Sequence, residues 1–240
     1  MPINLGGNEL NGLGVKLFNN INIPTDSLSY YWDAGLTDSY PGSGTTWTDF
    51  MGNRNGTLNN GPVYNSGNGG YLAFDGSNDS NTFTTFNLGN GNIAWAVYAW
   101  IRTTSGASTS LGQGSILSNS SSGPVYSVIG VTGNVITYYT YHSGNWNRIN
   151  GSITVNDNTW RLLTWVQKSN YYMDGYVNGT LDLNNGYSES GNSNPIDIMA
   201  ASWAGAFQVN LGMVAVYFNT THTQSQILQF YNGTRKRFGV

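Results

Sequence analysis

The sequence predicts an all-β sandwich, and three observations support that prediction. Asn, Gly, Ser and Thr fill 112 of the 240 positions, and these residues favour turns over helix interiors. Aromatic residues make up 14% of the chain, and with the β-branched residues they favour half-buried sheet surfaces. Short apolar segments alternate with turn signals at roughly the 8–12-residue spacing of sandwich strands. A chain of this length is commonly a single all-β domain.

In the first half of the chain, residues 29–32, 71–74 and 82–86 are predicted as short strands. Residues 36–70 are dominated by Gly, Asn and Pro, which indicates a long series of turns. The segment 93–101 is apolar at its odd-numbered and at its even-numbered positions, so both faces of a strand there would be apolar. That pattern is typical of a central strand whose two faces are both covered.

The second half of the chain predicts two hairpins. Residues 125–131 and 135–141 flank a Gly-containing turn, and residues 160–166 and 171–177 form a similar pair. Asn178-Gly179 is typical of a type I′ turn, because both residues tolerate positive φ. Further strands are predicted at 181–183, 195–200 and 206–218.

One helix is predicted near the C-terminus. Thr223 and Gln226 have the spacing of a capping box. Ile227, Leu228 and Tyr231 then fall on one helix face, and the helix is expected to end at about Asn232-Gly233, with the glycine as its cap. The cations at 235–237 are interpreted as a tail near the helix C-terminus. A basic patch for a partner is the alternative.

Residues 1–24 differ from the rest and are predicted as an N-terminal arm, with the sandwich domain spanning 25–240. The segment mixes glycines with single apolar residues, and Leu13, Val15 and Leu17 alternate as in an extended strand. It could complete the main sandwich or dock on a neighbouring chain, and we favour docking. The apolar residues expected to dock are Leu5, Leu10, Leu13, Val15, Leu17 and Phe18.

Charge and composition exclude several classes of function. The chain has 9 Lys and Arg against 12 Asp and Glu, for a net charge of −3, so we expect no nucleic-acid partner. No apolar run approaches the length of a membrane span, so no membrane partner is expected. There is no cysteine, and the N-terminus lacks the pattern of a secretory signal.

An ordered series of motifs carries a family resemblance. The motifs are Tyr31-Trp32-Asp33-Ala34-Gly35, residues 39–49, Gly56-Thr57-Leu58, Gly69-Gly70-Tyr71-Leu72-Ala73-Phe74-Asp75-Gly76, Asp157-Asn158-Thr159-Trp160, Tyr176-Val177-Asn178-Gly179 and residues 226–239. This order resembles a concanavalin A-like lectin/glucanase domain of the laminin-G type, as found in bacteriophage virion proteins. The resemblance implies a jelly-roll sandwich of two antiparallel sheets with one short C-terminal helix. It also implies glycan binding, protein binding or virion assembly.

Glucanases of this fold need two carboxylates close together. The chain has two glutamates, Glu9 and Glu189, which lie far apart in sequence, and its aspartates sit beside turns. His142 and His222 are interpreted as surface or capping residues. We therefore expect no catalytic residue and a protein that is not an enzyme.

One metal site is worth testing. Asp75, Asn78 and Asp79 offer the hard oxygen ligands that Ca²⁺ prefers, and domains of the resembled type often hold calcium. The spacing is not that of an EF-hand. The competing interpretation is a turn capped by its own Asp side chains. No other cofactor is expected.

A glycan site is predicted at Asn145, Trp146 and Asn147. Gly144 precedes them, and a turn tip would expose the indole between two amide hydrogen-bonding groups. The competing interpretation is that the aromatic residues mostly pack the core.

Together these observations predict a non-enzymatic structural protein of a virion surface. It would decorate the capsid or another virion component, dock through its arm on other virion proteins, and form a homo-oligomer. The alternative is a tail-fibre or surface lectin-like module that binds host polysaccharide.

Overall fold

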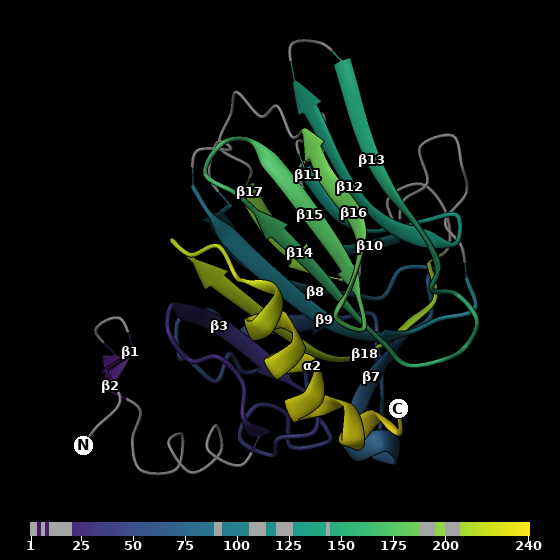
Figure 1. The fold of residues 1–240 in the computed structure, drawn as a ribbon. Helices are drawn as coiled ribbons and strands as arrows, with labels where there is room; N and C mark the ends of the chain where they lie inside the picture. Colours follow the sequence, from purple (N-terminus) through teal and green to yellow (C-terminus); the bar gives the residue numbers. More distant parts are fainter. Residues whose placement is uncertain are drawn as a thin grey trace.

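The computed structural model describes residues 4–5, 8–9, 21–88, 93–105, 114–118, 127–142, 145–187, 195–199 and 207–240. Two antiparallel β-sheets lie face to face, and one helix packs on the outside of one of them (Figure 1). This arrangement confirms the predicted all-β sandwich with a C-terminal helix. The turn-rich composition maps onto the connections, where Asn60, Asn158 and Asn178 adopt positive φ.

The first sheet, here called sheet one, has eight strands in the order β13-β12-β11-β10-β17-β8-β5-β4. Their bounds are β4 Thr46–Trp47, β5 Gly56–Asn59, β8 Ser80–Asn87, β10 Gly114–Ser118, β11 Ser127–Thr132, β12 Val135–His142, β13 Asn145–Thr154 and β17 Pro195–Met199. The predicted hairpin around Gly133 is β11–β12, which is confirmed. β12 and β13 form a second hairpin that rises above its neighbours in Figure 1.

The second sheet, sheet two, has the order β16-β15-β14-β9-β18-β7-β6, and β3 also pairs with β18. Its strands are β3 Leu28–Asp33, β6 Val63–Asn65, β7 Tyr71–Phe74, β9 Trp95–Arg102, β14 Arg161–Gln167, β15 Tyr172–Val177, β16 Thr180–Tyr187 and β18 Val209–Phe218. A 3₁₀ turn, η1, spans Gly67–Gly69. The predicted turn at Asn178-Gly179 joins β15 to β16, with φ of 52° and 78°.

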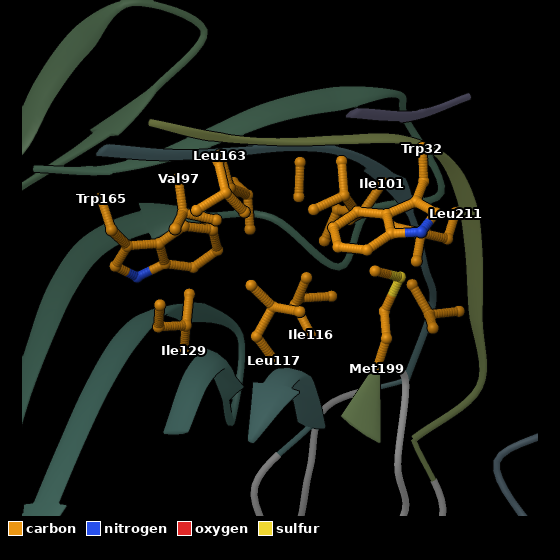
Figure 2. Packing of buried hydrophobic residues seen from close by; sticks show 14 of the residues in the cluster. Trp32, Val97, Ile101, Ile116, Leu117, Ile129, Leu163, Trp165, Met199 and Leu211 are labelled. Atoms are coloured by element: carbon orange, nitrogen blue, oxygen red, sulfur yellow. The ribbon is translucent and has the colours of Figure 1, made fainter. Parts of the chain in front are cut away.

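The main core fills the space between the sheets. Figure 2 shows Trp32, Val97 and Trp165 of sheet two facing Ile129 and other side chains of sheet one. The Trp165 indole reaches across and donates a hydrogen bond to the Thr137 carbonyl at 2.9 Å. β9 is buried at every position except Arg102, which confirms the central strand that its two-sided apolar pattern predicts.

A second apolar cluster lies on the other face of sheet two, beneath helix α2, Gln224–Phe238. Phe230 stacks on Tyr98 with ring centroids 4.2 Å apart, and Phe238 stacks on Trp100 at 4.4 Å. Sheet two is thus covered on both faces, by sheet one and by the helix (Figure 1). Among the helices in the described part of the chain, none combines the length and hydropathy that a bilayer crossing requires.

The predicted start of the helix is confirmed, and its predicted end is wrong. Thr223 and Gln226 form the capping box. The helix continues beyond Gly233 to Phe238, and Gly239 caps it with φ of 75°. Gly233 has a packing role instead, because a Cβ there would lie 2.0 Å from the Ile21 carbonyl oxygen.

Little of the predicted arm lies among the described residues. Asn4–Leu5 (β1) pairs with Asn8–Glu9 (β2) in a small antiparallel ladder. Leu10, Leu13, Val15, Leu17 and Phe18 lie outside the described residues, as does the Leu5 side chain. At the end of the arm, Ile23 packs in the cluster beneath α2.

Candidate functional site: a polar patch on sheet one

The face of sheet one that points away from the core is polar along β10 to β13. Residues alternate between faces along a strand, and Ile129, Val131, Ile136 and Tyr138 all lie in the main core. The residues between them therefore face outward. This outward set, called the polar patch below, comprises Ser115, Ser118, Thr132, Thr137 and Asn150.

A cross-strand row organises the patch around a glycine. Ser115 pairs with Gly130, Gly130 with Thr137, and Thr137 with Asn150. The Thr137 hydroxyl donates a hydrogen bond to the Asn150 side-chain oxygen. A Cβ at position 130 would lie 1.9 Å from the Gly114 carbonyl oxygen, beside the register shift in β10, so only glycine fits there. The Gly114 carbonyl therefore packs against the Gly130 backbone at the centre of the row.

Three hydroxyl groups of the patch have no hydrogen-bond partner within the described part of the chain. Ser115 Oγ, Ser118 Oγ and Thr132 Oγ1 are all buried and unpaired, although buried polar atoms are bonded in the large majority of cases. At β13 the row reaches solvent, because Asn150 is exposed, as is Arg148 two residues earlier. The patch therefore has unused hydrogen-bonding capacity at one end and an open edge at the other.

The predicted glycan residues lie on the same strand as the open edge. Trp146 pairs with Tyr141 and Asn147 with Thr140, near the turn of the β12–β13 hairpin. This position agrees with the turn tip expected from Gly144. The side chains of Asn145 and Trp146 are outside the described part, and Asn147 is partly buried.

The predicted calcium ligands form a turn between β7 and β8. The Asp75 carboxylate accepts hydrogen bonds from the Ser77 and Asn78 amides at 2.7 and 3.3 Å, and Asp79 accepts one from the Asp75 amide at 2.9 Å. The Ser77 amide holds the pKa of Asp75 below its usual range, and burial raises the pKa of Asp79. These contacts are those of a self-capped turn.

The calcium prediction for this turn is directly testable. Ca²⁺ would have to draw the Asp75 and Asp79 carboxylates away from backbone amides that already neutralise them. Because of that competition we expect millimolar Ca²⁺ to leave the melting temperature unchanged within 1 °C, measured by scanning calorimetry against an EDTA-treated sample. A rise that is lost in Asp75→Asn would instead establish the metal site.

The buried carboxylates hold the fold together. Asp33 pairs with Arg237, Asp174 pairs with Lys168, and Asp182 of β16 accepts hydrogen bonds from the Ser152 and Ile153 amides of β13. Asp49 accepts four backbone amides. Within the described ranges, His, Cys, Asp and Glu form no group of three suited to a metal ion.

His222 is buried, so its interpretation as a surface or capping residue is wrong. It is 3% exposed, and its Nδ1 lies 2.6 Å from the Tyr98 hydroxyl. Its ring lies 4.4 Å from the Tyr217 ring, and its Nε2 is buried without a partner. Burial lowers the pKa of His222 to about 4.

Sequence reasoning missed the polar patch. The segment 114–118 reads Gly-Ser-Ile-Leu-Ser, and its two serines flank two core residues because of the register shift. A strict period of two would have placed Ser115 and Ser118 on opposite faces. Alternation of hydroxyl and apolar residues in 129–138 was the signal available in sequence.

No model of a protein family matches this sequence, and no curated protein matches it. Solved structures do. The binding domain of Paraclostridial Mosquitocidal Protein 1 has 15% identity and a TM-score of 0.62, with 85% of this chain and 52% of that chain covered. Domain 4 of AbnA, a GH43 extracellular arabinanase from Geobacillus stearothermophilus in complex with arabinotriose, has 16% identity and a TM-score of 0.63, with 85% and 98% covered.

Two further solved structures are similar to this chain at comparably low sequence identity. The binding domain of botulinum neurotoxin serotype D has 13% identity and a TM-score of 0.64, with 86% of this chain and 52% of that chain covered. Trypanosoma rangeli sialidase has 14% identity and a TM-score of 0.59, with 90% and 34% covered. The chain spans about half the length of the two toxin binding domains. At such identities the likeness concerns fold alone, and that fold is a lectin-like β-sandwich.

Proposed function

We propose that this chain is a carbohydrate-binding module without catalytic activity, and that the polar patch of sheet one is its binding face. The observation that supports the proposal most is the row of polar side chains that ends at the exposed Asn150 on β13, with three unpaired hydroxyls in the patch behind it. A sugar presents hydroxyl groups that both donate and accept, which suits Ser and Thr hydroxyls with the same dual capacity.

The fold comparisons support a binding role. Two of the similar structures are described as binding domains, and a third holds arabinotriose. Among the described residues, the carboxylates of Asp33, Asp49 and Asp182, in contrast, serve an ion pair and backbone amides.

The test is a glycan array followed by titration of the best ligand. Asn150→Ala removes the exposed acceptor of the patch and leaves Thr137 unpaired, so we expect affinity to fall about tenfold, the loss of one or two hydrogen bonds. Trp146→Ala tests the predicted turn tip in the same assay. Asn53→Ala, which removes an exposed amide in the loop after β4, is the matched control. Unchanged affinity in Asn150→Ala would remove the polar patch from the proposal.

A virion-surface role is a second proposal, supported by the motif resemblance. In that role residues 1–24 dock the sandwich on other virion proteins, and the chain assembles as a homo-oligomer. Deleting residues 1–24 should then abolish incorporation into particles and convert the oligomer to a monomer in light scattering. Unaltered incorporation of the truncated chain would exclude the arm as the docking element.

A further inference from the structure

Arg102 is a cation without a carboxylate partner. The chain has only 9 Lys and Arg, and among the described residues Arg161, Lys168 and Arg237 form ion pairs with aspartates. Arg102 forms none there. It is the last residue of β9 and the one position of that strand that is not fully buried.

Two aromatic rings hold the Arg102 guanidinium. Its Cζ lies 5.2 Å from the Tyr71 ring centroid and 5.3 Å from the Trp160 ring centroid. Nη2 donates a hydrogen bond to the Tyr71 hydroxyl at 3.1 Å. Tyr71 and Trp160 contact each other edge to face at 5.4 Å, and Phe238 packs on Trp160 at 4.8 Å. The guanidinium is therefore fixed in place before any ligand arrives.

The fixed guanidinium has donors to spare. Of its five N–H groups, one hydrogen bond is made within the described part of the chain. Arg102 Nε is buried without a partner, and so is Nε1 of the adjacent Trp160. The buried Nε is closed to a ligand, but the terminal Nη groups belong to the partly exposed end of the side chain, and a planar anion can accept from such groups bidentately.

Among the described residues, the surface beside Arg102 is partly exposed, and α2 ends at Phe238. Arg102 pairs across the sheet with Asn210, Asn210 with Ala73, and Ala73 with Val63. Asn210 and Ala73 are partly exposed, and Val63 is 65% exposed. A ligand held by Arg102 would thus meet an amide and then a small apolar strip.

We propose that Arg102, Tyr71, Trp160 and Asn210 form a binding site for the carboxylate of an acidic sugar. The guanidinium takes the carboxylate, the Asn210 amide takes a ring hydroxyl, and the strip at Ala73 and Val63 meets the C–H face of the ring. The site is on the opposite side of the sandwich from the polar patch. Its sugar preference rests on the proposed function, whereas its carboxylate preference does not.

The test compares ligands that differ in one feature. Sodium glucuronate, glucose, sodium acetate and glucose 6-sulfate are titrated at constant ionic strength, and the Trp160 indole N–H resonance, assigned from Trp160→Phe, is followed by ¹H–¹⁵N NMR. We expect glucuronate to shift this resonance in a saturable way and glucose to leave it unmoved. Acetate and the sulfate should bind at least fivefold more weakly than glucuronate. An equal response to acetate, or to the sulfate, would overturn the assignment to a sugar carboxylate.

Three variants separate the site from general charge effects. Arg102→Gln should abolish the glucuronate response while the other indole resonances keep their positions, which shows that the fold is intact. Arg54→Gln removes the same charge and another arginine that lies over a tyrosine ring, Tyr30, and should keep the full response. Arg102→Lys, which keeps the charge at position 102, provides the second measurement if Arg102→Gln does not fold, and should weaken binding at least tenfold.

The binding results for Arg102→Gln and Asn150→Ala distinguish the Arg102 site from the polar patch. Loss of glucuronate binding in Asn150→Ala but not in Arg102→Gln would overturn the Arg102 site and leave the proposed function standing. Loss of glucuronate binding in Arg102→Gln, with binding kept in Asn150→Ala, supports the Arg102 site whatever the glycan array shows for neutral glycans.

Discussion

At the scale of single residues, charged groups of this chain hold the backbone in place through hydrogen bonds. Asp49 illustrates this, because its two oxygens accept the amides of Tyr31, Met51, Asn53 and Arg54 at 2.8–3.1 Å. Burial raises the pKa of Asp49, and these four amides oppose that rise. One carboxylate thereby shapes the loop after β4 and ties it to β3.

Asp49→Asn should destabilise the protein by about 3 kcal/mol, because an amide nitrogen would then face two of the four donors. Urea denaturation measures the change. Asp38→Asn, at an exposed position, is the control and should change stability by less than about 0.5 kcal/mol. Equal stability of the two variants would show that the four hydrogen bonds contribute nothing net.

His222 should make stability depend on pH. Its folded pKa of about 4 lies below the ordinary value of 6.5, so the unfolded chain takes up a proton first as the pH falls. Its stabilising contribution is complete above pH 6.5 and is lost progressively down to about pH 4, by about 3 kcal/mol in total.

Denaturation at pH 7, 5 and 4 tests this, with His222→Gln as the comparison. The variant should be less stable at pH 7 because it disturbs the contact with Tyr98, yet it should lose less stability on acidification than the native chain does. Parallel pH profiles would assign the acid sensitivity to other groups.

At the scale of elements, helix α2 is fastened at both ends. Its start has the capping box of Thr223 and Gln226, and Gln224 bonds to the Gly179 carbonyl. Near its end, Arg237 binds both oxygens of Asp33, at 2.5 and 2.6 Å, and the Gly70 carbonyl at 2.8 Å. Asp33 is 2% exposed, so this ion pair is shielded from solvent.

Arg237→Gln should cost about 3–5 kcal/mol, because it leaves the Asp33 carboxylate buried without its cation. Arg235→Gln is the matched control in the same helical turn, since Arg235 is exposed. The double variant with Asp33→Asn should recover part of the loss in a urea-denaturation cycle. A loss of stability below about 1 kcal/mol in Arg237→Gln would mean that the Asp33 carboxylate becomes hydrated or binds another partner.

At the scale of the whole molecule, local sequence patterns predicted the architecture. Contacts between residues far apart in sequence determine the features that the sequence did not predict. The two-sided apolar run of β9 and the capping box of α2 are local signals, and both are confirmed. Gly233 looked like a helix cap, but the Ile21 carbonyl oxygen approaches it from far away in sequence. The burial of His222 and the ring contacts of Arg102 arise in the same way, from elements that only the fold brings together.

Removing residues 219–240 should prevent a compact native state, because it uncovers Tyr98, Trp100, Met213 and Tyr217 on sheet two. We expect strong binding of a hydrophobic dye and a loss of near-UV circular dichroism. Removing residues 239–240 alone leaves α2 in place and should preserve both signals. A truncated chain with a cooperative melting transition would show that sheet two does not need the helix.

The position of β18 has a consequence for how the chain is made. This strand, at residues 209–218, pairs with β9 on one side and with β3 and β7 on the other. A nascent chain lacks this strand until residue 218 has been made, so the earlier strands β3, β7 and β9 have unpaired edges until then. Sheet two therefore cannot be completed before β18 is available, and a fragment that ends before residue 209 is not expected to be stable.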